Sequence, residues 1–507
     1  MFKQKRPLFL CQKIFQGKQD NRFRSIPNFF LFLFYFLGFN GLLLAQEEVA
    51  KSDYNHSNGI ILYDTVKSTF VIIKEIVIAG NSITKEKIIL REMGIKKGDT
   101  IVTNTMDGRL AWIKNRIFNT TLFLSVDLNL TGDSIYKVLY INLRERFYFT
   151  PFLAGGLGDR NFNEWWQDRH HALNRIDYGL NLKIRNIVGL NHTLRLKATT
   201  GFNQKAEVSY AVPYIDKKLK TGLIVNAQMV FNKQVAFETY QHKLNYIETN
   251  GYGRKKFNIG FFFTRRNKFY SFHQLGPYFQ YTTVQDTIAQ SNPNYFLNGA
   301  TFQRSYGAKY IFTRDRRDYI YYPLKGHYLK TELDFQHLVS VKTLDVASLR
   351  VEYAQYIPFK KNLFFASGIR IKVSNPSVQP YYSQRGLGYN REWVSGYERY
   401  VIDGQSYALL KTNLRWQILS IKPTLKFISL KKFRTVPLRM YLKVYSDQGY
   451  VVDNTYNPYN NFLSNRLLVG GGVGLDIVTY YDIVTRIECS VNGLGQAGIF
   501  LNLKAGL

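Results

Sequence analysis

The stretch that decides the fold lies in the C-terminal part of the chain and reads Leu438-Arg439-Met440-Tyr441-Leu442-Lys443-Val444-Tyr445. Apolar residues occupy every second position, and charged residues or tyrosines stand between them. Because successive side chains of a β-strand point to opposite faces of the sheet, this pattern predicts a strand with one apolar and one polar face. A charged face cannot meet lipid, so in a membrane it must face a wet lumen.

Similar runs recur from residue 146 to the end of the chain, with turn residues between them. Two further examples are the alternating segments 194–199 and 329–335. Runs of this kind suit tilted transmembrane strands, which need about 9–11 residues each. An open sheet edge in lipid leaves backbone groups unpaired, so the strands must close. We therefore predict a mainly β protein with a transmembrane antiparallel β-barrel over residues 148–507.

The composition of the 507 residues agrees with this prediction but does not prove it. Aromatic residues make up 16% of the chain, and the mean hydropathy is −0.22. Past residue 46 there is no apolar run of the length that a membrane-spanning helix needs. A soluble β-sandwich has a similar composition, so composition alone leaves both classes open.

The N-terminal segment has the pattern of a secretory signal peptide. Seven basic residues come first, and the apolar stretch 29–44 ends at Ala45-Gln46. This order predicts a signal peptide over 1–45 with cleavage after Ala45, and a retained membrane anchor is the alternative. Residues 46–69 are polar and without periodicity, so we expect a flexible lead-in.

The formal charge of the chain is +32, and about +26 remains without residues 1–45. On a soluble domain such a charge would indicate a nucleic-acid partner. On an exported, strand-rich protein it indicates anionic lipid headgroups or a basic lumen instead, and we expect no nucleic-acid partner. A generally basic proteome is the alternative explanation.

Residues 70–147 have a different pattern from the rest. Strands are predicted at 70–79, 122–130 and 136–143, and helices at 84–92 and 103–118. This order, together with Ile76-x-Ile78-x-Gly80-Asn81, resembles one POTRA domain. We therefore expect a small α/β domain, with Gly80 and Asn81 as its motif, before the barrel.

A loop motif within the barrel region reads Gly386-Leu387-Gly388-Tyr389-Asn390-Arg391-Glu392-Trp393-Val394-Ser395-Gly396-Tyr397-Glu398. It resembles the inward-folded loop of the BamA/TamA family of outer-membrane barrels. In that family a Val-Arg-Gly-aromatic tip pairs with an acidic residue of the barrel wall. Here Ser395 stands at the arginine position, and Arg391 and Arg399 are candidate replacements. An ordinary surface loop is the alternative.

Two further motifs resemble the same family. Tyr445-x-Asp447-x-Gly449 is similar to the wall motif whose Asp meets the loop. Asp315-x-Arg317-Asp318, followed by Pro323 and Gly326, is similar to a mid-barrel hairpin, and we expect it to be structural.

The resemblance implies sixteen strands, a bacterial outer-membrane location and a periplasmic α/β domain. It implies that the protein folds and inserts unfolded outer-membrane proteins, with accessory lipoproteins as possible partners. The barrel is expected to close between a first strand near 148–156 and a last strand, 499–507. Gly155-Gly156 would weaken this seam. A dedicated secretion pore, a passive channel and a structural surface barrel are the alternatives.

Enzyme motifs are weak or absent. Gly493-x-Gly495-x-x-Gly498 matches a dinucleotide fingerprint, but no strand-to-helix context surrounds it. Gly470-Gly471-Gly472 is interpreted as relief of strand curvature. The adjacent His170-His171 would point apart on a strand and do not indicate a metal site. We expect no catalytic residues, no metal and no cofactor.

Overall fold

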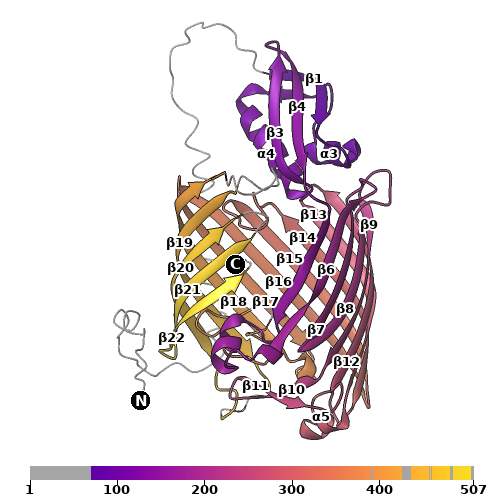
Figure 1. Ribbon diagram of the computed structural model, residues 1–507, viewed down its shortest axis with the longest axis vertical. Coiled ribbons are helices and arrows are strands. Elements are labelled where there is room, and N and C mark those ends of the chain that lie inside the picture. The colour runs from indigo at the N-terminus through magenta and orange to yellow at the C-terminus, as the bar shows by residue number, and fades with distance from the viewer. Residues whose placement is uncertain are drawn as a thin grey trace.

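The computed structural model describes residues 70–389, 392–424, 436–455, 457, 459–479 and 483–503. The predicted signal peptide at 1–45, the lead-in at 46–69 and the terminal Leu507 lie outside these residues. A small α/β unit stands at one end of a large barrel (Figure 1). We call this the POTRA end of the barrel and the opposite end the distal end.

The α/β unit confirms the predicted order of elements. Its elements are β1 (Phe70–Ala79), α3 (Glu86–Met93), β2 (Thr100–Val102), α4 (Met106–Asn119), β3 (Phe123–Gly132) and β4 (Tyr136–Glu145). The sheet order is β2-β1-β4-β3, and β1 runs parallel to β4. The short strand β2 was not predicted, since three residues carry too little periodicity to be recognised.

Both helices begin later than predicted, and for α3 the cause is visible. The Glu145 carboxylate accepts hydrogen bonds from the Thr84 amide at 2.8 Å and from the Ser82 hydroxyl at 2.8 Å. These bonds hold residues 82–84 in a turn before the helix. Gly80 has φ +87°, and a Cβ there would lie 1.9 Å from the Leu143 carbonyl oxygen, so only glycine fits. The Asn81 side chain donates to the Thr84 carbonyl oxygen at 3.1 Å.

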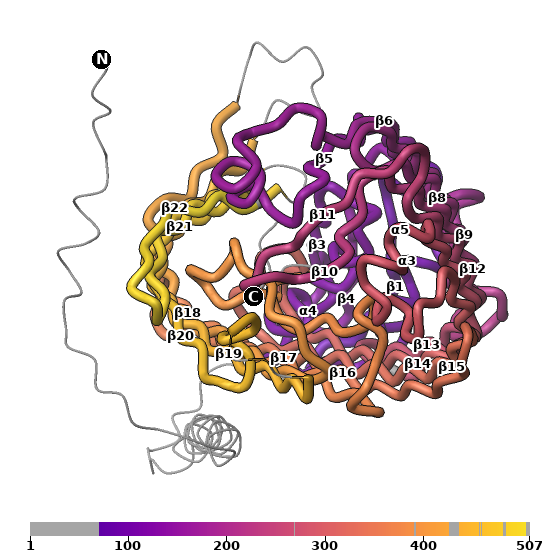
Figure 2. The backbone as a smooth tube through the Cα atoms, turned by 90° about the horizontal axis from the view of Figure 1, so that it is seen from below, coloured from indigo at the N-terminus to yellow at the C-terminus, as the bar shows by residue number. Residues whose placement is uncertain are grey.

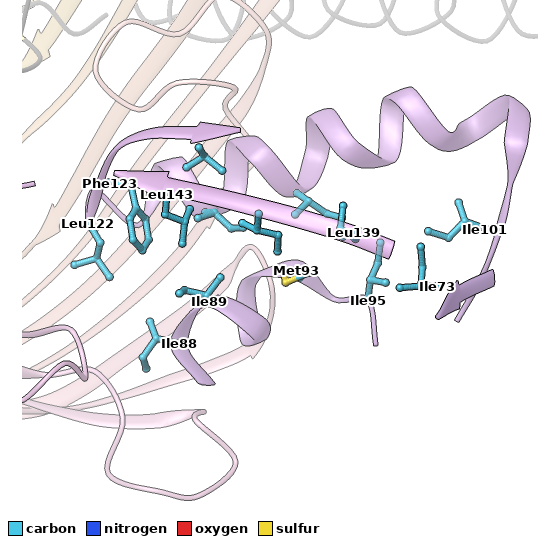
Figure 3. Packing of buried hydrophobic residues seen from close by; sticks show 14 of the residues in the cluster. Ile73, Ile88, Ile89, Met93, Ile95, Ile101, Leu122, Phe123, Leu139 and Leu143 are labelled. Atoms are coloured by element: carbon cyan, nitrogen blue, oxygen red, sulfur yellow. The ribbon is translucent and has the colours of Figure 1, made fainter. Parts of the chain in front are cut away.

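The unit has its own apolar core between the helices and the sheet (Figure 3). Ile73, Leu139 and Ile141 come from the sheet, and Ile113 and Ile117 come from α4. All five side chains are fully buried. Burial of apolar side chains of this size stabilises the fold by about 1.5–3 kcal/mol each, which accounts for an independent small domain.

The barrel is one sixteen-stranded sheet with antiparallel neighbours. Its strands are β5 (Phe149–Leu157), β6 (Ile176–Ile187), β7 (His192–Gly201), β8 (Asn203–Val212), β9 (Thr221–Asn232), β12 (Arg254–Lys268), β13 (Ser271–Val284), β14 (Phe302–Asp315), β15 (Gly326–Val339), β16 (Thr343–Lys360), β17 (Leu363–Asn375), β18 (Ser406–Ile421), β19 (Leu438–Val452), β20 (Leu467–Val478), β21 (Val484–Asn492) and β22 (Ala497–Leu503). The mainly β fold class and the strand number are confirmed. No helix in the described ranges has the length and apolarity needed to span a membrane.

The alternation on β19 separates the two faces of the wall as predicted. Leu442 and Val444 point outward with 44% and 58% of their surface exposed, whereas Tyr441 and Lys443 are buried inside. The Lys443 ammonium lies 2.7 Å from a Glu488 oxygen and 3.2 Å from an Asp476 oxygen. The inner wall therefore carries paired charges, which is how a protein tolerates ions away from bulk water.

The distal end of the barrel is covered by its own connections. The hairpin of β10 (Gln234–Tyr240) and β11 (Lys243–Glu248) forms a separate sheet and runs across this opening (Figure 2). It packs on an apolar cluster that includes Val235, Ile288 and Phe296, with Ile288 coming from the short helix α5 (Asp286–Ser291).

The α/β unit is attached to the barrel by an ionic cluster around Glu92. This buried carboxylate bonds two nitrogens of Arg266, which belongs to β12, and also contacts Arg116 at 3.1 Å and Arg91 at 3.0 Å. Burial raises the pKa of Glu92, but Arg266, Arg116 and Arg91 outweigh it and hold the pKa below its usual 4.5.

Other bonds reach the barrel turns at the same end. The Lys85 amide donates to the Gly189 carbonyl oxygen at 3.0 Å, and the Asn119 side chain donates to the Asp318 carbonyl oxygen at 3.2 Å. The unit is therefore fixed to the barrel at several turns and not merely tethered by the chain.

We predict that Glu92→Gln loosens this attachment by about 3 kcal/mol, because three arginines then lose their buried counter-charge. In the unchanged protein the attachment should also weaken as the pH falls below about 4.5. A carboxyl group whose pKa is lowered by docking stabilises the docked state at pH values above its usual pKa. This stabilisation is lost as the pH falls through the lowered pKa. Distance measurements between spin labels on the α/β unit and the barrel would report the separation.

The exposed Glu86 of the same helix supplies the control, since Glu86→Gln removes an equal charge without touching the cluster. Equal loosening by the two variants would contradict the role assigned to Glu92.

Candidate functional site: the inward loop and the strand seam

The long connection between β17 and β18, described at residues 376–389 and 392–405, folds back into the lumen. We call it the inward loop. Its tip residues Val394, Ser395, Tyr397 and Glu398 are at most 3% exposed. The loop motif therefore lies inside the barrel and is not the ordinary surface loop that was the alternative.

Asp447 on the inner face of β19 holds the tip. The Ser395 hydroxyl donates to Asp447 Oδ2 at 2.5 Å, and the Ser395 amide donates to the same oxygen at 3.2 Å. The positive charge comes from the wall, because Lys411 Nζ on β18 lies 3.0 Å from this oxygen. A buried carboxylate with a cation and two further donors is satisfied without a loop arginine.

Of the two arginines considered as replacements, only Arg399 lies among the described residues. Arg399 pairs with Asp168 instead, and Arg391 lies outside the described residues. Lys411 was not predicted as the partner of Asp447. The two residues stand directly opposite each other in the β18–β19 ladder, and Lys411 points into the lumen. Opposite charges at facing positions of a ladder attract each other.

Two glycines of the inner wall make room for the tip. A Cβ on Gly470 of β20 would lie 1.8 Å from the Ser395 carbonyl oxygen, and one on Gly449 would lie 2.4 Å from a methyl carbon of Val394. The interpretation of Gly470 as relief of curvature is therefore incomplete, because its lack of a side chain lets the loop backbone approach the wall. Gly449, predicted as part of the wall motif, likewise leaves space for the loop tip, at Val394.

The rest of the tip is fixed by β21 and an apolar cluster. Asn492, at the end of β21, donates from Nδ2 to the Gly396 carbonyl oxygen at 2.8 Å, and Gly396 has φ +84°, which favours glycine. Tyr397 packs in a cluster with Val394, Tyr407 and other buried side chains.

Glu398 is the exception in this well-paired site. Its side chain is fully buried, and within the described part of the chain neither carboxyl oxygen has a hydrogen-bond partner. Burial raises the pKa of this loop carboxyl to about 8, and Glu488 and Asp447 add to the effect while Lys411 opposes it. The seated loop therefore favours a neutral, protonated Glu398.

The first and last strands of the barrel form the seam. β5 and β22 stand at the two ends of the sheet order, and among the described residues no ladder joins them. β22 has only seven residues, and a Cβ on Gly155 or Gly156 of β5 would meet no atom within 4 Å. β5 and β22 correspond to the predicted seam strands, and residues 504–507 of the predicted last strand lie outside the described residues. Between the described parts of the two strands there is no ladder.

The inward loop joins the two sides of the seam at the distal end. On one side, Tyr400 donates its hydroxyl to Gln496, in the turn before β22, at 3.0 Å. On the other side, Arg399 pairs with Asp168, and Arg160 donates to the Gly388 carbonyl oxygen at 2.7 Å. Asp168 and Arg160 belong to the connection after β5. We call these contacts the clasp.

The mid-barrel hairpin motif forms the turn between β14 and β15 at the POTRA end. Arg317 binds the Asp315 carboxylate through two nitrogens at 2.8 and 2.6 Å, and Asp318 accepts the Leu324 amide at 3.0 Å. The Pro323 carbonyl oxygen accepts a hydrogen bond from Arg415 at 3.2 Å, and Gly326 has φ +103°. These contacts fit the structural role that was expected.

We predict that Gly470→Ala drives the tip off the wall, because the added methyl group overlaps the Ser395 carbonyl group. Overpacking of this kind costs about 1–3 kcal/mol, so amide hydrogen exchange in residues 393–400 should become about tenfold faster or more. Gly108→Ala in α4, where a Cβ meets nothing within 4 Å, is the matched control. Unchanged exchange in Gly470→Ala would contradict the proposed packing.

A second prediction concerns Glu398. Its raised pKa means that seating of the loop takes up a proton, so seating should weaken as the pH rises from about 4.5 through about 8. Hydrogen exchange of the tip at pH 6 and pH 9, corrected for the intrinsic rate, measures this. Glu398→Gln keeps the shape without the charge and should abolish the pH dependence. A variant that retains it would show that another group titrates.

Comparisons with known proteins agree with this geometry. The model of the Omp85 superfamily domain matches residues 186–479, and that of the surface antigen variable number repeat, a POTRA family, matches residues 71–146. No curated protein matches the sequence.

Three solved structures are similar to this chain over most of its length. BamA from Haemophilus ducreyi lacking POTRA domains 1–3 is 13% identical with a TM-score of 0.48, and the match covers 86% of this chain and 84% of that one. CdiB from Escherichia coli is 10% identical with a TM-score of 0.49, covering 85% and 75%. CdiB from Acinetobacter baumannii is 13% identical with a TM-score of 0.46, covering 86% and 73%. Since the superfamily model matches more than half of the sequence, the chain belongs to the Omp85 superfamily and carries one POTRA domain before its barrel.

Proposed function

We propose that this protein folds β-barrel proteins and inserts them into the bacterial outer membrane, with its α/β unit in the periplasm. The single observation that carries the proposal is the seam between β5 and β22, which no ladder joins in the described residues. Unpaired strand edges offer backbone donors and acceptors to an incoming strand. Such templating needs no catalytic group, metal or nucleotide.

The inward loop supports this proposal because it spans the seam by side-chain contacts. The Arg399–Asp168 pair and the Tyr400–Gln496 bond can break and reform without unfolding a strand ladder. Exposed ion pairs and single hydrogen bonds contribute about 1 kcal/mol each. The two sides of the seam can therefore separate at the loss of a few side-chain contacts and without the loss of a strand ladder.

The α/β unit supplies a first contact for substrate. Its sheet has two outer strands, β2 and β3, and β3 is the longer with ten residues. An extended segment of an unfolded outer-membrane protein can add to this edge by backbone hydrogen bonds, which tolerate many sequences. Lipids with anionic headgroups are proposed as further partners, in line with the basic charge of the chain, and accessory lipoproteins as possible ones.

The test is a covalent tether across the seam. Leu153 of β5 and Ile499 of β22 are outward apolar residues with 88% and 69% exposure. Cysteines at these two positions, with both native cysteines replaced by serine, can be joined by a flexible bismaleimide. We expect the tether to stop insertion of a model barrel substrate into vesicles, since the edges can no longer separate.

A pair within a formed ladder is the matched control, because Leu196 and Val208 already face each other on β7 and β8. Insertion should survive that tether. Insertion that also survives the seam tether would contradict the proposal. A steady, large conductance in planar bilayers would favour the alternatives, a secretion pore or passive channel. Depletion in the host, followed by quantitation of outer-membrane proteins, would show whether the clients are many or few.

A further inference from the structure

A cavity lies in the distal part of the lumen, apart from the contact between Ser395 and Asp447. Its volume is about 490 Å³. The lining combines three arginines with several tyrosines, among them Arg160, Arg254, Arg385, Tyr295, Tyr382 and Tyr389. The arginines come from the connection after β5, from β12 and from the inward loop, so the fold brings them together from distant parts of the sequence.

Two of these cations lack a carboxylate partner. Arg254 donates to the Asn232 side-chain oxygen at 2.9 Å and to the Tyr295 hydroxyl at 3.3 Å, both neutral groups. Arg385 lies over the rings of Tyr382 and Tyr389. Within the described ranges neither guanidinium forms a salt bridge, and neither does the neighbouring inward residue Lys256.

Several other cations of the lumen form salt bridges. Lys411 pairs with Asp447, and Lys443 pairs with Glu488. Arg370 pairs with Glu352. At the cavity itself Arg160 is paired with Glu164 at 2.8 Å. Arg254, Arg385 and Lys256 thus bring positive charge to the cavity without a salt bridge in the described ranges. Enclosed uncompensated charge is costly unless an anion can reach it.

The side chain of Tyr382 in the inward loop responds to this positive charge. Burial raises the pKa of Tyr382, but Lys256, Arg254 and Arg385 outweigh burial and bring the pKa down to about 8. Asp403 accepts a hydrogen bond from the Tyr389 hydroxyl at 2.6 Å. Burial raises the pKa of Asp403 although this bond and the charge of Arg385 oppose it, so Asp403 is a weakened counter-charge to Arg385.

We propose that this cavity binds a phosphate group, held between Arg254 and Arg385 and surrounded by the tyrosines. Guanidinium groups present several donors in a plane and suit phosphate oxygens. A phosphate monoester carries about −1.5 to −2 charges at neutral pH, which complements the positive charge of the two arginines. The volume also admits a small organic group, which the tyrosine rings would contact by their faces.

The test is calorimetric titration of the full-length protein in detergent at constant ionic strength. Inorganic phosphate and glucose 6-phosphate are the two probes, and acetate is the reference anion. We expect saturable binding of a phosphate probe, and binding about tenfold weaker or worse in Arg385→Gln, which removes one charged donor group. Lys256→Gln should weaken binding less, because that residue lies beside the cavity.

The matched control is Arg304→Gln, because this exposed arginine lies over Phe302 and Tyr281 on the outward face of the wall. Tighter binding of glucose 6-phosphate than of phosphate would assign an organic ligand, and equal binding would assign the free anion. The proposal is overturned if neither probe binds saturably, if acetate competes equally, or if Arg304→Gln weakens binding as much as Arg385→Gln. Near-ultraviolet spectra of each variant establish that it is folded.

Discussion

The placement of the inward loop depends on the need to balance a buried charge away from bulk water. Asp447 is the clearest case, because its carboxylate is satisfied by Lys411 from the neighbouring strand and by two donors of Ser395. Half of that arrangement belongs to the wall and half to the inward loop. Lys411 and Asp447 both belong to the barrel wall, so their ion pair does not depend on the loop. When Ser395 detaches, Asp447 therefore keeps its cation.

This arrangement explains how the chain tolerates Ser395 where related sequences are expected to carry arginine. An arginine in the loop would supply both the charge and the contact, whereas here the two tasks are divided between Lys411 and Ser395. Gly470 completes the change, because its missing side chain lets the Ser395 backbone reach the wall. The loop contributes hydrogen bonds and shape, and the barrel contributes the charge.

Much of the fold follows from local pattern, since alternation at 438–445 is enough to assign the inner and outer faces of β19. The loop motif likewise marks the segment that enters the lumen. Lys411 and Gly470 escaped prediction because each looks ordinary in its own strand. Their use depends on contacts with residues far away in sequence, which no local period encodes. The lack of a β5–β22 ladder among the described residues escaped for the same reason, because pairing is a property of two distant segments.

The clasp has a consequence for the direction in which the barrel can come apart. Its contacts, Arg399–Asp168, Arg160–Gly388 and Tyr400–Gln496, all lie at the distal end of the seam. Separation of the two edges is therefore cheapest at the opposite end, beside the α/β unit. The two edges would then separate first beside the α/β unit, while the β10–β11 hairpin still covers the distal opening (Figure 2).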